Sequence, residues 1–316
     1  MAPMPPYVDE PSVQTLPGPI AFTGLSMSAF LLDADRTVLK TLCDSLIAAP
    51  SGGRVRFTPL APLVVMSFTD FPSATFVDFP DRGSASEREF SFGVPGVYAV
   101  YDGGGALVET AFALFMPFLF LDNPVAMLTG RESYGYFKQQ GAIGMPTDAG
   151  SNGFTAKVYG CKTFGAGASW EEQALVSLER VSGPPLTNVL GLPWPDPLSA
   201  AAALVERILS ALGDGAPSAD VFANLLLGQM PQIFLKQSRD IADGTRACYQ
   251  AIALAHYSVT RIESVSLEDR YAMTVQTLDS TPLAAALGLA PPSETGLGVR
   301  IVMDMTLEPG RVLWQA

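Results

Sequence analysis

A long alternating run near the C-terminus is the feature that most constrains the fold. The alternation in residues 245–269 is made largely of small and β-branched residues, and the YAMTVQTL segment that follows repeats it. Side chains of a strand point to opposite faces in turn, so this pattern predicts strands rather than helices. Long strands of this kind are typical of a curved antiparallel sheet.

The first half of the chain predicts more strands and a tight turn. RVRFTPLAPLVVMSFTDF alternates, and FSFGVPGVYAVYD and ALVETAFALFMPFLF flank an Asp-Gly-Gly-Gly turn at 102–105. This arrangement predicts a β-hairpin. A phosphate-binding loop is the less favoured interpretation of the glycines, because no strand-to-helix crossover follows them.

Helical patterns are few. Regular structure is expected from Ser28, with Asp33 or Asp35 capping a helix that ends near Ala48. Residues 198–228 predict two helices, which we interpret as an insertion that packs or forms an oligomer contact, with a lid over the site as the alternative. The resulting prediction is an α+β, mainly antiparallel fold with a curved, β-barrel-like sheet and a few peripheral helices. We expect a single domain over 1–316, with an irregular, proline-rich arm at 1–19.

Composition narrows the classes of function. The chain is 48% hydrophobic and 16% charged, which is typical of a folded protein, and its net charge of -12 disfavours nucleic-acid binding. Three widely spaced cysteines indicate neither a disulfide framework nor a metal site, and a single histidine excludes a multi-histidine metal site. The N-terminus has no signal-peptide pattern, and the longest apolar run is too short to span a bilayer. We therefore expect a cytoplasmic protein with no nucleic-acid or membrane partner.

One lysine follows the most apolar part of the chain. Residues 111–121, AFALFMPFLFL, precede an Asn123-Pro124 pair that predicts a helix start, and the aromatics of SYGYF lead into Lys138. Burial can lower the pKa of a lysine by roughly 3 to 5 units, and a neutral lysine can attack a carbonyl to form a Schiff base. Lys138 is therefore the first candidate for a nucleophile.

The segment LDNPVAMLTGRESYGYFK resembles the signature of the acetoacetate decarboxylase family. In that family an LDN-type turn leads to Gly-Arg-Glu, here Gly130, Arg131 and Glu132, and the Schiff-base lysine follows six positions after the Glu. The resemblance places Lys138 on the nucleophile. Two positions depart from the pattern: Phe137 replaces the proline before the lysine, and Gln139 replaces a second lysine after it.

Outside this segment the resemblance extends over most of the chain, but the matches are weaker. Glu89 stands six residues before Pro95, as does a family glutamate that handles protons, and FLKQSRDIADGTRACYQAIAL matches the family's later segments. An arginine that the family uses near its N-terminal helix falls on Leu31. These matches imply the family's fold, a small oxo acid as substrate, no cofactor and no metal, and a homo-oligomer.

The resulting hypothesis is a Schiff-base lyase. We expect Lys138 as nucleophile, Glu89 and Glu132 as proton-transfer groups, and four substrate-binding residues: Arg131, Tyr134, Phe137 and Gln139.

Because Gln139 carries no charge, desolvation by Phe115, Phe118, Phe120 and Phe137 must lower the pKa of the lysine, and Arg131 is left to hold a carboxylate. A carboxylate that is held favours aldol or dehydration chemistry on a 2-oxo acid. Decarboxylation of a β-oxo acid and a non-catalytic binding protein of the same fold are the alternatives.

Overall fold

The strands of the protein join one continuous sheet. The computed structural model describes residues 6–8, 15, 17–148, 150–181, 229–290, 294–295 and 298–316. Within these ranges 13 strands pair in the order β11-β8-β7-β6-β5-β9-β10-β12-β1-β3-β4-β2, with β13 on β10. The strands are β1 (Ile20–Asp33), β2 (Val55–Pro59), β3 (Leu63–Phe76), β4 (Ser84–Tyr101), β5 (Leu107–Leu121), β6 (Lys138–Gly144), β7 (Gly153–Gly160), β8 (Glu171–Arg180), β9 (Gln229–Arg239), β10 (Ala247–Leu267), β11 (Tyr271–Val275), β12 (Gly298–Leu307) and β13 (Arg311–Gln315).

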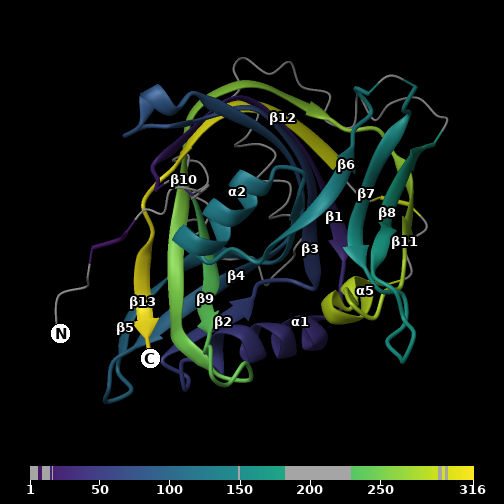
Figure 1. Ribbon diagram of the computed structural model, residues 1–316. Helices are drawn as coiled ribbons and strands as arrows, with labels where there is room; N and C mark the ends of the chain where they lie inside the picture. Colours follow the sequence, from purple (N-terminus) through teal and green to yellow (C-terminus); the bar gives the residue numbers. More distant parts are fainter. Residues whose placement is uncertain are drawn as a thin grey trace.

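The sheet closes on itself into a ring. β5 pairs with β9 on one side and with β4 on the other, so the path from β5 through β9, β10, β12, β1 and β3 returns through β4 to β5. The pairings are antiparallel except for two parallel contacts, β5 with β6 and β5 with β9. Figure 1 shows the curved strands of this ring and the separate group of β7, β8 and β11 beside it. The predicted mainly antiparallel, barrel-like fold is confirmed.

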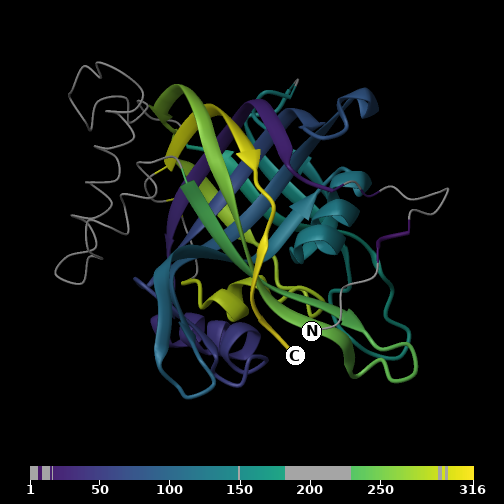
Figure 2. The ribbon, with the colours of Figure 1, turned by 90° about the vertical axis from the view of Figure 1, so that its left-hand side faces the viewer.

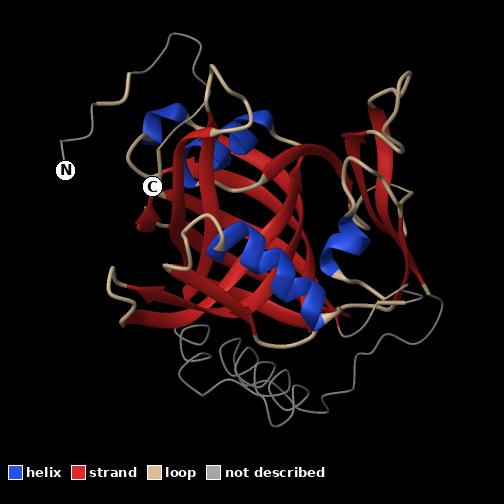
Figure 3. Cartoon of the chain, turned by 90° about the horizontal axis from the view of Figure 1, so that it is seen from below, coloured by secondary structure: helices blue, strands red, loops and turns tan. Residues whose placement is uncertain are grey.

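Short helical segments lie outside the strands. They are α1 (Arg36–Cys43) with the π-helical turn η1 (Asp44–Ala48), the 3-10 turn η2 (Pro80–Arg82), α2 (Pro124–Thr129) with the π-helical turn η3 (Gly130–Tyr134), and α5 (Leu283–Leu287). α1 and α5 lie beneath the ring in Figures 1 and 2, and Figure 3 views that end from below. None of the helices in the described part of the chain is long and apolar enough to cross a membrane.

Polar side chains cap the helices and close the hairpin turn as the sequence predicts. The side chain of Asp35 accepts hydrogen bonds from the backbone N–H groups of Thr37 and Val38, which caps α1. Asn123 caps α2 in the same way, and Pro124 takes the first helical position. The Asp102 side chain accepts from the N–H groups of Gly104 and Ala106 and closes the β4–β5 hairpin.

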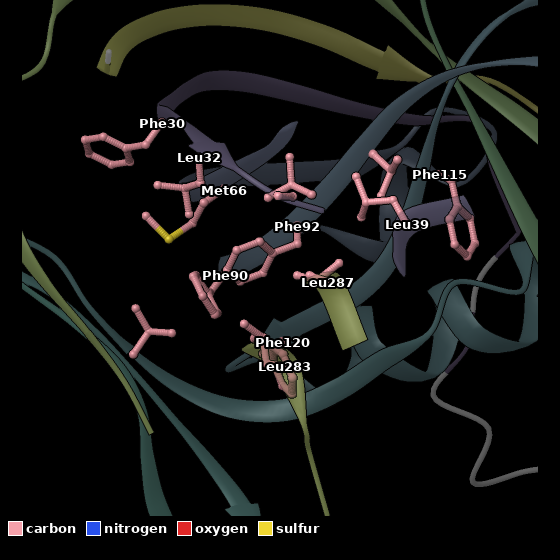
Figure 4. Packing of buried hydrophobic residues seen from close by; sticks show 14 of the residues in the cluster. Phe30, Leu32, Leu39, Met66, Phe90, Phe92, Phe115, Phe120, Leu283 and Leu287 are labelled. Atoms are coloured by element: carbon pink, nitrogen blue, oxygen red, sulfur yellow. The ribbon is translucent and has the colours of Figure 1, made fainter. Parts of the chain in front are cut away.

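Two apolar clusters fill the molecule. The first packs phenylalanines of β1, β3, β4 and β5 against leucines of α1 and α5, and Figure 4 shows Phe30, Phe90, Phe92, Phe115, Phe120, Leu39, Leu283 and Leu287 among them. The second cluster includes Phe22, Met116, Leu119, Tyr134, Tyr136, Phe234 and Tyr257. The two clusters lie on different faces of β5, because its neighbouring residues Leu119 and Phe120 belong to different clusters.

Some expectations differ from the structure. Regular structure begins at Ile20, earlier than Ser28, because the IAFTGLSMSAF segment pairs with both β3 and β12. β8 was not predicted, since its EEQALVSLER sequence contains several good helix formers that pairing with β7 and β11 overrides. The predicted helices at 198–228 lie outside the described residues, as does most of the 1–19 arm.

Candidate active site

The register of three strands places one lysine and two glutamates on a common face. Lys138, the first residue of β6, pairs with Leu119 of β5, and Glu89 of β4 pairs with Leu121. Glu87 precedes Glu89 by two residues in β4, so both side chains point to the face shared by Leu119 and Leu121. The intervening Arg88 points to the other face and binds Asp148 through paired contacts of 2.9 and 2.8 Å.

The side chains of these three residues meet in the interior. The Lys138 Nζ lies 3.5 Å from a carboxylate oxygen of Glu89 and 3.9 Å from one of Glu87. All three residues are buried, with exposures of 6% for Lys138, 6% for Glu87 and 9% for Glu89. The other carboxylate oxygen of Glu87 is buried without a hydrogen-bond partner in the described part of the chain. A buried amine therefore faces two buried carboxyl groups.

The charges of the cluster set its protonation. Burial raises the pKa of Glu87 to about 7, which Lys138 opposes and Glu89 and Asp122 reinforce. Burial lowers the pKa of Lys138, but the negative charges of Glu87 and Glu89 and the Glu89 hydrogen bond outweigh it, so the pKa lies above its ordinary value. The expectation that desolvation alone lowers this pKa is wrong, because burial brings two carboxylates as well as apolar surface.

Gly130 and Arg131 hold the lysine-bearing segment. The carbonyl of Gly130 accepts from the N–H groups of Gly135 and Tyr136, at 3.0 and 3.1 Å, and ends the helical turn before β6. Arg131 donates from Nη1 to the backbone carbonyl of Lys138 at 2.8 Å. The Gly-Arg of the motif thus fixes where β6 begins.

A small cavity lies beside the amine. Its volume is about 30 Å³, room for about two water molecules. Lys138, Glu87, Gly130, Tyr134, Tyr136 and Tyr257 line it together with apolar residues that include Ile20, Phe22, Phe76 and Leu307. The Lys138 Nζ lies 5.5 Å from the centre of the Tyr136 ring. The hydroxyls of Tyr136 and Tyr257 lie 3.4 Å apart, and burial raises the pKa of both phenols.

Tyr134 is the predicted substrate-binding residue that the structure places in this cavity. Its hydroxyl is buried and has no hydrogen-bond partner among the described residues. It faces Gly18, where an added Cβ would lie 1.9 Å from the hydroxyl oxygen. Burial, with a smaller effect of Glu308, raises the pKa of Tyr134 to about 12, so the group is a hydrogen-bond donor at neutral pH.

The other predicted binding residues lie outside the lining of the cavity. Arg131 is exposed and occupied by the carbonyl of Lys138. Gln139 is exposed, and as the residue after Lys138 in the strand it points to the opposite face. Phe137 is half-buried and packs edge-on against Phe115, with ring centres 6.3 Å apart.

Glu132 was expected to transfer protons, but it is exposed on the helical turn and accepts a hydrogen bond from Tyr7 of the N-terminal arm. The expectation that four phenylalanines surround the Lys138 side chain is wrong for two of them. Phe118 and Phe120 alternate with Leu119, which pairs with Lys138, so both side chains point away from the lysine.

Sequence reasoning missed Glu87 and two tyrosines. The strand was expected to begin at Phe90, whereas β4 begins at Ser84. The available signal for Glu87 was its spacing of two residues from Glu89, which places both on one face once the strand includes them. Tyr136 stood within the quoted motif, but Tyr257 comes from β10, more than a hundred residues later, and only the closure of the ring brings it to the site. Among the described residues no cluster of three or more His, Cys, Asp or Glu side chains could hold a metal ion.

Comparison with solved structures identifies the fold. An acetoacetate decarboxylase from Legionella pneumophila superposes with a TM-score of 0.57 at 13% identity, covering 99% of this chain and 93% of that one. A second acetoacetate decarboxylase gives 0.56 at 14% identity, with coverages of 98% and 96%. The enduracididine biosynthesis enzyme MppR, in complex with the condensation product of pyruvate and imidazole 4-carboxaldehyde, gives 0.51 at 16% identity, with coverages of 96% and 92%.

No family model matches the sequence, and no curated protein matches it. The chain is a closed, mainly antiparallel β protein with a buried lysine beside its internal cavity. Its fold is that of acetoacetate decarboxylase and of acetoacetate decarboxylase-like enzymes, as the sequence resemblance implied.

Proposed function

We propose that the protein is a Schiff-base lyase in which Lys138 is the nucleophile. The observation that carries this proposal is the position of the Lys138 amine, which is buried against a cavity and within 4 Å of two carboxyl groups. An amine kept from bulk water beside groups that exchange protons is the arrangement that imine chemistry needs. The acetoacetate decarboxylase fold supports the same reaction class.

The reaction begins with a proton transfer inside the cluster. Glu89, at 3.5 Å, takes a proton from the ammonium of Lys138, and the neutral amine attacks the substrate carbonyl. The carbonyl oxygen takes one proton from the attacking amine and one that Glu89 returns, and leaves as water, so that an iminium remains on Nζ. The iminium then accepts the electron pair of a bond broken at the neighbouring carbon, whose other fragment leaves as carbon dioxide or as a carbonyl compound. A carboxyl group of the cluster protonates the resulting enamine, and water then hydrolyses the iminium, which releases the product and the amine of Lys138.

Trapping tests this function directly. Incubation with acetoacetate, with pyruvate and with a wider panel of oxo acids and ketones, followed by borohydride reduction and peptide mass spectrometry, should place the added mass on Lys138. Lys236 is the control lysine, because it is half-buried and burial lowers its pKa. Lys236→Ala should keep the label and Lys138→Ala should lose it. Label on Lys236, or no label with any compound, contradicts the proposal.

The reaction that follows the imine has two candidates. Aldol or dehydration chemistry on a 2-oxo acid was preferred because Arg131 was expected to hold a carboxylate, and Arg131 instead binds the backbone of Lys138. Decarboxylation of a β-oxo acid needs no such partner and is therefore equally supported. Carbon dioxide release from acetoacetate, measured beside condensation of pyruvate with an aromatic aldehyde, distinguishes the two.

A non-catalytic binding protein is the rival function, and the raised pKa of Lys138 favours it, because an ammonium held between two carboxylates is a poor nucleophile. A ligand that raises the melting temperature equally in the wild type and in Lys138→Ala, without turnover, would establish the rival. The homo-oligomer and the cytoplasmic location stay predictions. Light scattering at micromolar concentration tests the first.

A further inference from the structure

The cavity beside Lys138 holds more negative than positive charge. Among its lining residues in the described part of the chain, Lys138 is the one cation and Glu87 the one acid, and Glu89 adds a second carboxylate at 3.5 Å from the amine. The negative charge of Asp122 also raises the pKa of Glu87. When Lys138, Glu87 and Glu89 are all ionised, the three side chains together carry a net negative charge.

The nearby cations are engaged elsewhere. Arg88 lies between the two glutamates in sequence, but its side chain binds Asp148 on the other face of β4. Arg131 donates to the backbone of Lys138. Lys236 donates to the backbone carbonyl of Ser133 at 2.9 Å and does not line the cavity.

We propose that the site takes an uncharged carbonyl compound, an aldehyde or ketone with small apolar substituents and no carboxylate. This inference rests on the proposed Schiff-base function but replaces the expected oxo acid by a neutral carbonyl compound, so that of the two candidate reactions the aldol type remains and decarboxylation does not. The apolar part of the lining, with Ile20, Phe22 and Phe76, has the same chemical character as such substituents.

Charge balance during the reaction supports this choice. A neutral ketone leaves the charge of the cluster unchanged, because the iminium carries the same single positive charge as the ammonium that it replaces. A carboxylate would instead add a third negative charge to a site from which water is excluded, where repulsion between charges is strong. Among the described residues, the Tyr134 hydroxyl is a buried group of the lining that has no hydrogen-bond partner. A neutral hydroxyl satisfies a neutral oxygen but does not compensate a buried carboxylate.

Matched pairs that differ mainly in charge test the inference: acetoacetate with acetoacetamide, and pyruvate with pyruvamide. Each is incubated with the protein at pH 7.5 and cyanoborohydride, and the rate of label on Lys138 is divided by the rate for free Nα-acetyl-lysine. Adducts of acetoacetate are counted before and after loss of carbon dioxide. We expect each amide to label at least about tenfold faster than its acid after this correction.

Removal of one negative charge provides the second measurement. Glu87→Gln should lower the ratio of the amide labelling rate to the acid labelling rate severalfold. If this variant does not fold, Glu89→Gln removes one negative charge in its place. Corrected labelling by the acids that equals or exceeds labelling by the amides overturns the inference while the Schiff-base function stands. Absence of label with all four compounds overturns both. A ratio unchanged in the folded variants shows that charge does not set the preference.

Discussion

The α-carbon of Gly130 lies against the side chain of Lys138. A Cβ at Gly130 would lie 2.6 Å from Cδ and 2.9 Å from Cε of the lysine, and 3.4 Å from its Nζ. The backbone of Gly130 is α-helical, with φ of -63°, so the glycine is needed for space rather than for an unusual conformation. The glycine of the Gly-Arg-Glu motif therefore makes room for the buried lysine, while the arginine beside it holds the lysine's backbone.

Gly130→Ala should slow labelling of Lys138 strongly and leave the fold intact. The new methyl group must displace the lysine stem, and a displacement of about 1 Å at a reacting group can cost about 100-fold in rate. Overpacking should also lower the free energy of unfolding by about 1–3 kcal/mol. Trapping kinetics and denaturant unfolding measure the two effects.

Gly165→Ala is the matched control, because a Cβ there meets no atom within 4 Å. It should leave both quantities close to those of the wild type. Equal labelling rates in Gly130→Ala and Gly165→Ala would show that the contact with Lys138 does not position the amine.

Glu89→Gln should shift the pH profile of labelling to lower pH. The charge of Glu89, 3.5 Å from the amine, helps to keep the pKa of Lys138 above its ordinary value. Because the neutral amine is the nucleophile, the wild-type labelling rate should still rise with pH above pH 9. Without the carboxylate the pKa of Lys138 falls, and the rise should begin at lower pH. A profile that stays in place, or moves to higher pH, contradicts this account of the cluster.

Glu87→Gln should stabilise the protein more at pH 8 than at pH 5. The pKa of Glu87 is about 7 in the folded protein and about 4.5 when unfolded. The folded state therefore binds the Glu87 proton more tightly, so the contribution of this group to the free energy of unfolding is fully present below pH 4.5 and is lost as the pH rises through 7. Glutamine removes this loss, which amounts to at most about 3 kcal/mol. Thermal unfolding across pH 5–8 measures the difference.

Glu179→Gln, an exposed glutamate in β8, is the control for that series. Its effect on the melting temperature should vary little across the same pH range. A Glu87→Gln effect that shrinks as the pH rises would mean that Lys138 stabilises the Glu87 carboxylate more than burial destabilises it.

The sequence predicts the fold well where local chemistry and strand pairing agree. Asp35, Asn123 and Asp102 each form the cap or turn that their side chains favour, and the alternating run at 245–269 becomes the long strand β10. It fails at β8, where neighbouring strands impose an extended conformation on a segment rich in helix formers.

The site was harder to predict because distance along the chain says little about which face a side chain takes. Arg131, Phe137 and Gln139 are close to Lys138 in sequence, yet their side chains lie outside the cavity. Glu87 and Tyr257 are distant and belong to it, since the register of β4 and the closure of the ring bring them there. The protonation of Lys138 depends on Glu87, so the missed residue also reversed the predicted direction of its pKa shift.

Tyr98→Phe provides the reference for a tyrosine whose hydroxyl is satisfied. The Tyr98 hydroxyl donates to Glu109 and accepts from Arg311 at 3.1 Å. Its removal leaves charged groups with one partner fewer and should cost about 1–3 kcal/mol in the free energy of unfolding. Labelling of Lys138 should not change, because Tyr98 does not line the cavity.

Tyr134→Phe should produce the opposite pair of effects. The Tyr134 hydroxyl is buried and has no hydrogen-bond partner within the described ranges, so its removal ends a desolvation cost and should raise the free energy of unfolding by about 1 kcal/mol. The same hydroxyl lines the cavity beside Lys138 and is free to donate to a substrate oxygen, so labelling by carbonyl compounds should become slower. A buried donor without an acceptor lowers the stability of the folded protein. Such a donor is expected in a binding site, because the ligand supplies the missing acceptor. Chemical denaturation and trapping kinetics on one preparation measure both quantities, and a variant that is less stable but labels at the wild-type rate would assign Tyr134 to packing alone.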